Sequence, residues 1–373
     1  MVKYALIGAM NQNNYTPLHL AALSGQTSTV ERLLRNGASI DATDNDRNTP
    51  LHLAVWKGHR DVVGLLLDEG ASTETITKAR NTSLHLAVWK GHTDIVKLLL
   101  DKDASIQAQN RRGNTALHIA ALKGHTGVVE ILLWKGASLH HRGENENTPL
   151  HFAARGGYTA TVKLLLEEGA SIQTININSS TSLYVAALNG RTDIVELLLS
   201  KGAQIDTRSR DYNTPLHIAA AEGHASVVEM LLGKGARIQN KGENGNTPLH
   251  FAARGGCTRT VNLLLEKGAE IDARGRDNNT PLHLAIVWGQ VDVVKLLLMK
   301  SGSTEVMNDY NSTPLHLAAA TRIDIVELLL IKGAPIGALN KYNQTPLQVA
   351  ALHGHTDIVQ LLTNHAVHGG DTA

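Results

Sequence analysis

Apolar residues recur along the chain in pairs of short blocks, and a glycine separates the two blocks of most pairs. The first block opens on a threonine, usually followed by proline, and spaces leucine and alanine along one helix face, as at Leu51 and Ala54. At the start of a helix, the threonine hydroxyl can accept a hydrogen bond from a backbone N–H group that has no partner within the helix. Proline is favoured at the first helical position because its φ angle is already close to the helical value and it has no N–H group. This block therefore predicts a helix of about two turns that ends at a glycine such as Gly58. The second block, with Ile95 and Val96 among its apolar positions, predicts a second helix.

The pairs of blocks repeat at a nearly constant period. Of the ten intervals between successive opening threonines, nine are 33 residues long and one is 32. Polar residues and glycine follow the second block, as in residues 41–48, and predict a turn that projects from the helix pair. Neither helix can bury its apolar face alone, so stacking of the pairs must supply the core. The eleven threonines are Thr16, Thr49, Thr82, Thr115, Thr148, Thr181, Thr214, Thr247, Thr280, Thr313 and Thr345.

The motif TPLHLA at residues 49–54, together with this period, resembles the ankyrin repeat family. The resemblance covers nearly the whole chain. It implies an all-α, ankyrin-repeat solenoid, elongated and curved, whose helix-turn-helix units carry projecting β-turn or hairpin loops. We expect residues 1–15 to be the partial turn of a truncated preceding repeat, residues 16–366 to form eleven repeats, and residues 367–373 to be a disordered tail.

The chain begins with a sequence that resembles one of its own internal turns. Residues 5–16, ALIGAMNQNNYT, align with residues 334–345, APIGALNKYNQT. The helix pair that precedes such a turn is missing at the start. We therefore expect the chain to be a fragment or a truncated descendant of a longer ankyrin protein.

Composition narrows the class of protein. Hydrophobic residues make up 42% of the 373 residues but aromatic residues only 3%, so the core must consist of Leu, Ile, Val and Ala. Lys and Arg number 35 against 34 Asp and Glu, so no overall charge favours nucleic acid or an anionic membrane. Cys257 is the only cysteine, which excludes an intrachain disulfide and favours a reducing compartment. We expect a cytoplasmic protein, or one in the host cytosol or nucleus if it is a secreted effector.

Nine of the 19 histidines occupy the fourth position of the repeated motif. This position is N3 of the first helix, from which a side chain can reach back to the backbone of the capping threonine. Gln348 and Tyr184 stand at the same position in two repeats, and we expect them to keep this hydrogen-bonding role, which a metal site would not explain. The nine are His19, His52, His85, His118, His151, His217, His250, His283 and His316.

The other histidines give no strong indication of a metal or catalytic site. Five follow the glycine after the first helix, and equivalent positions in stacked repeats lie about 8–10 Å apart, too far for two ligands of one zinc ion. Two clusters, His140–His141 and His365 with His368, remain unassigned. Because no catalytic constellation departs from the repeat, we predict no catalytic residues, no metal, no cofactor and no enzymatic activity. The five are His59, His92, His125, His224 and His355.

The positions that vary between repeats carry the functional expectation. In the ankyrin family, exposed residues seven and eight positions after each threonine, together with the turn residues, line a concave binding face. Three of the four tryptophans fall at these positions, and tryptophan is enriched at interface hot spots. The alternative is that the repeated VWKGH is a recent copy whose indoles cover neighbouring helices. The candidate partner-binding residues are Trp56, Lys57, Trp89, Lys90, Leu122, Lys123, Arg155, Arg254 and Trp288.

These observations favour a monomeric, non-catalytic scaffold that binds other proteins through the concave groove and the turn tips, with no nucleic-acid or membrane partner. A second interpretation is a sensor or targeting arm of a larger protein, such as an immune-type nucleotide-binding protein or an effector of an intracellular bacterium. A passive elastic spacer is a third.

Three repeats depart from the pattern, and we expect local opening near repeats six and ten. Repeat six lacks both proline and histidine, repeat ten is one residue short between its helices, and repeat three has Asp103 in place of the capping glycine.

Overall fold

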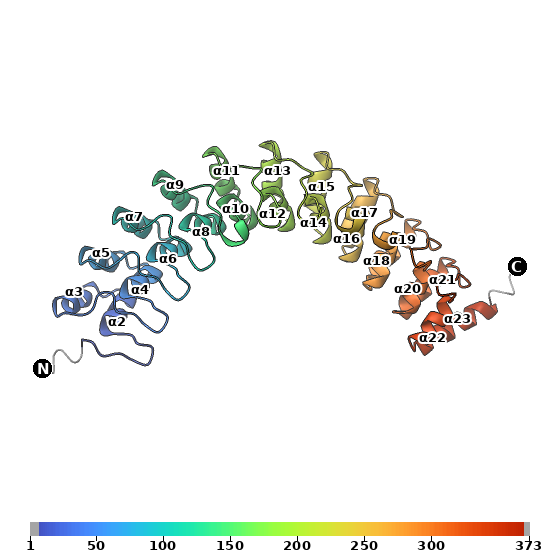
Figure 1. The fold of residues 1–373 in the computed structure, drawn as a ribbon, viewed down its shortest axis with the longest axis horizontal. Helices are drawn as coiled ribbons and strands as arrows, with labels where there is room; N and C mark the ends of the chain where they lie inside the picture. Colours follow the sequence, from blue (N-terminus) through green and yellow to red (C-terminus); the bar gives the residue numbers. More distant parts are fainter. Residues whose placement is uncertain (1–6, 369–373) are drawn as a thin grey trace. The chain divides into compact units, whose positions relative to one another are not determined.

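The computed structural model describes residues 7–368 and divides into two units, Met1–Asn178 (unit 1) and Ser179–Ala373 (unit 2). Within each unit, short helices alternate along the chain as first and second members of antiparallel pairs. In each unit, successive first helices pack against one another, and the second helices form a second row beside them (Figure 1). No β-strand occurs among residues 7–368.

Residues 7–178 of unit 1 form five helix pairs. The turn before the fifth pair also contains a short 3₁₀ helix, η1 (Glu144–Glu146). The pairs are α2 (Pro17–Leu23) with α3 (Thr27–Arg35), α4 (Pro50–Lys57) with α5 (Arg60–Asp68), α6 (Ser83–Lys90) with α7 (Thr93–Asp101), α8 (Ala116–Lys123) with α9 (Thr126–Trp134), and α10 (Pro149–Gly156) with α11 (Thr159–Glu167).

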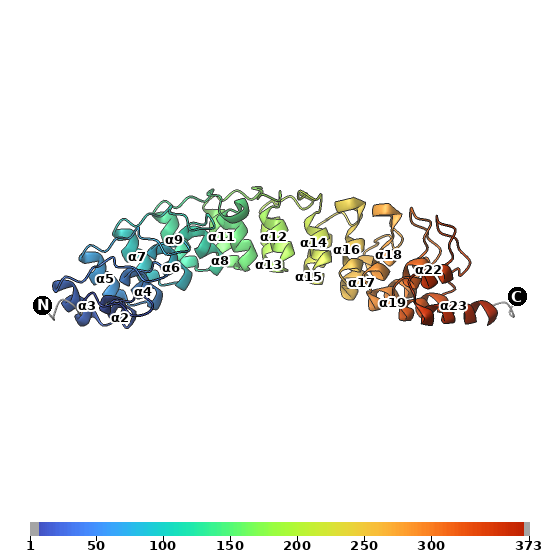
Figure 2. The ribbon, with the colours of Figure 1, turned by 60° about the horizontal axis from the view of Figure 1, so that its bottom comes forward.

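Residues 179–368 of unit 2 form six helix pairs, and the turns between them stand clear of the helices (Figure 2). Two of these turns contain 3₁₀ helices, η2 (Glu243–Gly245) and η3 (Arg276–Asn278). The pairs are α12 (Ser182–Leu188) with α13 (Thr192–Ser200), α14 (Pro215–Ala221) with α15 (Ala225–Gly233), α16 (Pro248–Arg254) with α17 (Thr258–Glu266), α18 (Pro281–Val287) with α19 (Val291–Met299), α20 (Pro314–Ala319) with α21 (Ile323–Ile331), and α22 (Pro346–Leu352) with α23 (Thr356–His368).

The core of each unit consists of small and branched aliphatic side chains from both rows. In the second pair, Leu51 and Ala54 of α4 and Val63 and Leu66 of α5 are fully buried. Alanine on the first helix allows the neighbouring helices to approach closely, while leucine and valine on the second fill the space between them. This packing explains how the chain forms a core with few aromatic residues.

The position between the two helices of a pair requires glycine for steric as well as conformational reasons. Gly58 adopts a left-handed conformation, with φ of 79°, at the end of α4. A Cβ atom at this position would lie 2.8 Å from the imidazole of His92 in the next repeat. In the same way, Nε2 of His59 lies 3.0 Å from the Leu23 carbonyl oxygen at the end of the preceding first helix. The Gly-His pair thus ends one helix and contacts the end of another.

In repeat six, the expectation that Tyr184 takes over the capping role of the motif histidine is wrong. The Thr181 side chain accepts from the backbone N–H of Tyr184 at 3.3 Å, but the tyrosine side chain does not return a hydrogen bond to the threonine backbone, and the capping box is absent. A phenol is too long to fold back onto the residue three positions earlier, whereas imidazole and the Gln348 amide both reach it.

The other irregular repeats keep their helices through local adjustment. Asp103 takes the left-handed conformation of the missing glycine, with φ of 59°. Ser301 does the same in repeat nine, with φ of 68°, a departure that the sequence reading overlooked. In repeat ten the deletion shortens α20 to six residues and leaves Arg322 extended before α21. Left-handed conformations are costly for residues with a Cβ atom, so these turns are strained relative to the glycine turns.

Both ends of the chain extend beyond residues 7–368, the part that the structure describes. Helix α23 continues to His368, two residues past the expected end of the last repeat. Residues 1–6 of the expected partial turn and residues 369–373 of the expected tail are outside the described residues.

Candidate functional site

The motif histidines take part in capping the N-termini of the first helices. In each of the nine repeats that carry one, Nδ1 of the histidine lies 3.1–3.2 Å from the backbone nitrogen of the capping threonine, and Gln348 Oε1 makes the equivalent contact at 2.8 Å. Because the backbone N–H donates, Nδ1 must be unprotonated. The ring proton of the neutral histidine is therefore on Nε2.

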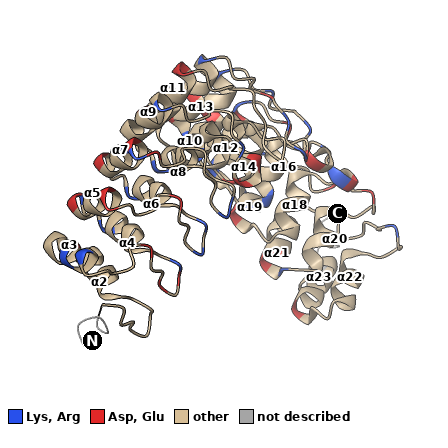
Figure 3. Cartoon of the chain, turned by 60° about the vertical axis from the view of Figure 1, so that its left-hand side comes forward, with Lys and Arg blue, Asp and Glu red and all other residues tan. Residues whose placement is uncertain are grey.

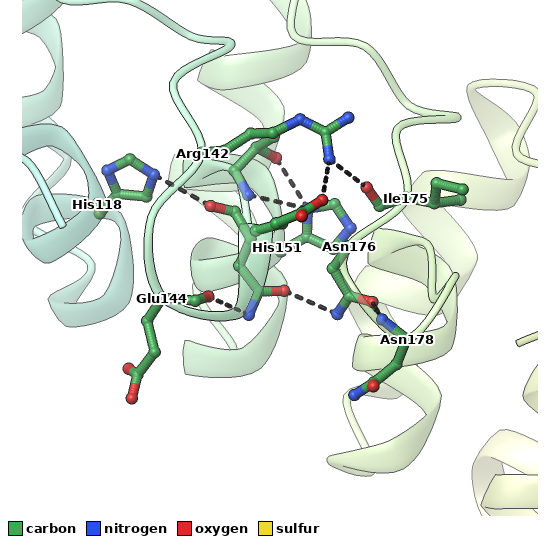
Figure 4. A network of polar contacts seen from close by, with 10 residues as sticks. His118, Arg142, Glu144, His151, Ile175, Asn176 and Asn178 are labelled. Atoms are coloured by element: carbon green, nitrogen blue, oxygen red, sulfur yellow. Dashed lines mark hydrogen bonds and ion pairs between the residues drawn. The ribbon is translucent and has the colours of Figure 1, made fainter. Parts of the chain in front are cut away.

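In seven of the nine histidines, Nε2 lies within 3.3 Å of a carbonyl oxygen in the turn that leads to the next repeat. Nε2 of His85 donates to the Asn114 carbonyl oxygen at 3.0 Å, and Nε2 of His250 donates to that of Asn279 at 3.0 Å. Nε2 of His118, a residue labelled in Figure 4, lies 3.1 Å from the carbonyl oxygens of both His141 and Asn147. In these seven histidines both ring nitrogens are engaged, whereas Nε2 of His52 is buried without a hydrogen-bond partner among the described residues.

Burial keeps these rings neutral. Desolvation lowers the pKa of His118 to about 4, and it does the same for four other motif histidines, with backbone carbonyls opposing the shift only in part. The four are His52, His217, His250 and His283. Among residues 7–368 no group of three or more His, Cys, Asp or Glu side chains could hold a metal ion.

A row of stacked aromatic and cationic side chains stands out on the first helices of unit 1. Nζ of Lys90, on α6, lies 3.8 Å from the centre of the Trp56 ring on α4. Nζ of Lys123, on α8, lies 3.7 Å from the centre of the Trp89 ring on α6. Each lysine thus covers one face of a tryptophan from the preceding repeat, a favourable cation–π arrangement.

Two adjoining hollows open beside these tryptophans. The first has a volume of about 570 Å³ and is lined by Trp56, Lys57 and Leu86 together with turn residues. The second, of about 530 Å³, runs from Trp56 past Trp89 to Leu122 and Arg155. Trp56 and Leu86 belong to both hollows, so the two form one surface across repeats one to five, which we call the Trp groove.

The tryptophans in the groove are neither core residues nor fully solvated. Trp56 is 39% exposed and Trp89 is 43% exposed, whereas Trp134, at the end of α9, is 81% exposed. Trp134 is therefore mostly in contact with solvent, in contrast to the two tryptophans of the groove.

Turn residues form the second wall of the groove. Arg111 and Arg112 reach it from the turn before α8, and Glu144 from the turn that contains η1. Figure 3 marks cationic segments on the turns beside α6 and α8, whereas the acidic residues of α5 and α7 lie at the ends of those second helices.

The η1 turn is held by a network of polar contacts (Figure 4). Nη1 of Arg142 contacts Glu146 Oε2 at 2.8 Å and the Ile175 carbonyl oxygen at 3.2 Å. Nδ2 of Asn176 donates to Asn147 Oδ1 at 2.9 Å. Such a network gives this part of the wall a defined shape.

A glycine lets the η1 turn approach the preceding repeat. A Cβ atom at Gly143 would lie 2.3 Å from Asn114 Oδ1, an atom that accepts from the Glu144 backbone N–H at 2.8 Å. Gly242 and Gly275 stand in equivalent contacts in unit 2. Sequence reasoning identified the polar turn but not this approach.

The structure separates the candidate residues from the sequence into two groups. Seven of them, from Trp56 to Arg155, gather at the Trp groove or stack on its tryptophans. The remaining two are in unit 2, where the Arg254 guanidinium lies 5.9 Å from the centre of the Trp288 ring. The sequence reading had not singled out Leu86, Ile119 or Phe152, which form the apolar floor and whose exposure depends on packing between repeats.

Comparison with known proteins identifies the architecture. A model described as three copies of the ankyrin repeat matches residues 1–77, 72–143, 135–209, 183–275, 216–309, 274–339 and 300–373. The chain belongs to the ankyrin repeat family. The expected all-α fold is confirmed.

A solved ankyrin structure is also similar. The ankyrin repeat domain of human ASB11 matches with a TM-score of 0.55 and 31% sequence identity, over 59% of this chain and 98% of that domain. A comparison with curated proteins gave no match.

Membership in the family gives a general activity. Ankyrin repeats are generally protein–protein interaction modules, and the fold is typically non-enzymatic. Within residues 7–368, no helix combines the length and the apolar character needed to cross a membrane.

Proposed function

We propose that this ankyrin chain is a scaffold that binds a partner protein through the Trp groove of unit 1, with Trp56 and Trp89 as the principal contacts. The observation that carries the proposal is the repetition of a half-exposed tryptophan in adjacent repeats, each stacked under a lysine and both lining one continuous hollow.

The energetics of tryptophan support this assignment. Large aromatic side chains that stay partly exposed in a hollow bury further apolar area when a partner fills it, and such residues contribute most of the binding energy at interfaces. A covering role for the indoles would not require a hollow of about 530 Å³ beside them. The charged rim of lysine and arginine around an apolar floor is the arrangement found at protein interfaces.

Affinity capture with matched variants tests the proposal. The intact chain, the Trp56→Ala/Trp89→Ala variant and the Trp134→Ala variant would be immobilised and exposed to lysate of the source organism or of its host. Retained proteins would be quantified by mass spectrometry, and circular dichroism would check that each variant keeps its helix content. Trp134 serves as the control because it is 81% exposed and lies on a second helix.

We expect one or more proteins to be retained by the parent and by the Trp134 variant but lost from the groove variant. Equal retention by all three chains would move the binding site elsewhere. The absence of specific retention by any of them would favour the spacer interpretation.

A further inference from the structure

The charged side chains that line the Trp groove are predominantly cationic. The two hollows are lined by five cations and two carboxylates, and Lys90 and Lys123 add two further positive charges above the tryptophans. This local excess contrasts with the whole chain, whose formal net charge is +1. The five cations are Lys57, Lys78, Arg111, Arg112 and Arg155, and the carboxylates are Asp46 and Glu144.

Both carboxylates already have partners. Asp46 Oδ1 lies 3.2 Å from Nζ of Lys78, and Glu144 Oε2 lies 3.6 Å from Nη1 of Arg112. By contrast, Lys57 and Arg111 form no ion pair among residues 7–368. Lys57 and Arg111 would therefore attract negative charge on a partner and would discourage a basic one.

The spacing of the tryptophans sets a length scale for the partner. Trp56 and Trp89 stand on neighbouring first helices, α4 and α6, and packed helices are about 8–10 Å apart. An extended chain rises about 3.1–3.4 Å per residue, so three residues span about 9–10 Å. In a polyproline-type conformation with three residues per turn, side chains three positions apart also share a face.

Stacking on the tryptophans distinguishes a peptide from a nucleic acid. Single-stranded nucleic acids bind by stacking bases on exposed aromatic faces along a cationic track. Here the lysine ammonium groups lie 3.8 and 3.7 Å above the tryptophan rings and occupy one face of each. Carboxylate side chains beside apolar anchors match this surface better.

We propose that the occupant of the Trp groove is an acidic, extended protein segment that places two apolar side chains, three residues apart, beside Trp56 and Trp89. The inference rests on the proposed function and adds the chemistry of the partner. Carboxylates that flank the apolar pair would meet the ammonium groups of Lys90 and Lys123, while the pair itself would enter the two hollows.

Selection from a random peptide library tests this chemistry without knowledge of the natural partner. Short random peptides displayed on phage would be selected on the intact chain, and enriched sequences would be synthesised with a fluorescent label. Their affinity would be measured by fluorescence anisotropy at low and high NaCl for the parent, the Trp56→Ala/Trp89→Ala variant and the Lys90→Met/Lys123→Met variant. Methionine keeps a long aliphatic side chain over each tryptophan but removes the charge.

A second pair of lysines gives a matched control for charge. Lys97→Met/Lys163→Met removes two exposed positive charges from the second helices α7 and α11. We expect enriched peptides that are acidic, with apolar residues at positions i and i+3. Their affinity should fall about tenfold or more in the Lys90/Lys123 variant and at high NaCl, and little in the control.

The outcomes separate the two proposals. Neutral or basic peptides that depend on Trp56 and Trp89 but not on the two lysines would overturn the acidic occupant and leave the groove as the binding site. Peptides that bind the tryptophan variant as well as the parent would contradict both proposals. Failure to enrich any peptide, or tighter binding of a labelled oligothymidylate that depends on the same tryptophans, would also overturn an acidic peptide occupant.

Discussion

The first helices of the two units present different surfaces although they share one fold. In unit 1, tryptophan recurs at the same position of adjacent repeats, and the next repeat places a lysine 3.8 or 3.7 Å from its ring centre. In unit 2, Trp288 stands one position later in its repeat, is 59% exposed, and lies beside Arg254 of the preceding repeat at 5.9 Å. A single exposed tryptophan therefore does not make a groove. Repetition of the pair in stacked repeats does, because each copy supplies one wall for the next.

The largest expected effect comes from removing the repeated aromatic pair. In the Trp56→Ala/Trp89→Ala variant, loss of two hot-spot side chains should weaken binding of a captured partner by about 4 kcal/mol, roughly a thousandfold. Trp288→Ala should change the affinity by less than about tenfold, because that residue lies outside the groove. Isothermal titration calorimetry with the purified partner would measure both. A larger loss for Trp288→Ala would reverse the comparison between the units.

Acid should destabilise both units, because each contains buried motif histidines that are neutral in the folded chain. Five motif histidines have a pKa lowered from 6.5 to about 4 in the folded chain, so unfolding takes up protons between these values. The stability from each neutral ring is fully present above pH 6.5 and is lost as the pH falls towards 4, by up to about 3 kcal/mol per histidine. Urea unfolding followed at several pH values would measure this loss.

A glutamine variant isolates the contribution of titration to this pH dependence. Gln348 caps its helix without a titratable group, so His118→Gln should keep the cap and reduce the slope of stability against pH. Unfolding midpoints that stay constant from pH 6.5 to 4 in the parent would contradict the assignment of neutral, buried rings.

Replacing a glycine by alanine should destabilise unit 1 more in the turn that forms the wall of the groove than in a second helix. Gly143→Ala should destabilise unit 1 by about 1–3 kcal/mol, because the new Cβ would displace the Asn114 side chain that accepts from Glu144. Gly127→Ala, in α9 with no neighbouring atom within 4 Å, should instead stabilise by up to about 1 kcal/mol. Thermal unfolding of the two variants would compare them, and equal shifts in Tm would argue against the close approach.

The smallest expected effect is local. Repeat six lacks the capping box and repeat ten lacks the left-handed glycine between its helices, so both should open more often than the repeats beside them. Hydrogen exchange followed by mass spectrometry should give faster exchange in α12 and α20 than in α14 and α18. Uniform protection along unit 2 would count against this prediction.

Features that depend on local sequence could be predicted, and contacts between repeats mostly could not. Threonine, proline and the motif histidine act within four residues, so the cap at Thr49 and the start of α4 follow from the sequence alone. The exposed position of Trp56 follows from helical spacing. In contrast, the cover of Trp56 by Lys90 depends on how far one repeat is displaced against the next. The approach of Gly143 to Asn114, 29 residues earlier, is likewise a property of stacking.

The tryptophan content of the chain allows a direct test of the central claim that a partner binds at Trp56 and Trp89. The chain has four tryptophans, so Trp134→Phe/Trp288→Phe leaves only the two in the groove. Titration of this variant with a captured partner or selected peptide should shift or quench the tryptophan emission to saturation, while a Trp56→Phe/Trp89→Phe chain should give little response. Emission that stays unchanged in the first variant at saturating partner would contradict binding in the Trp groove.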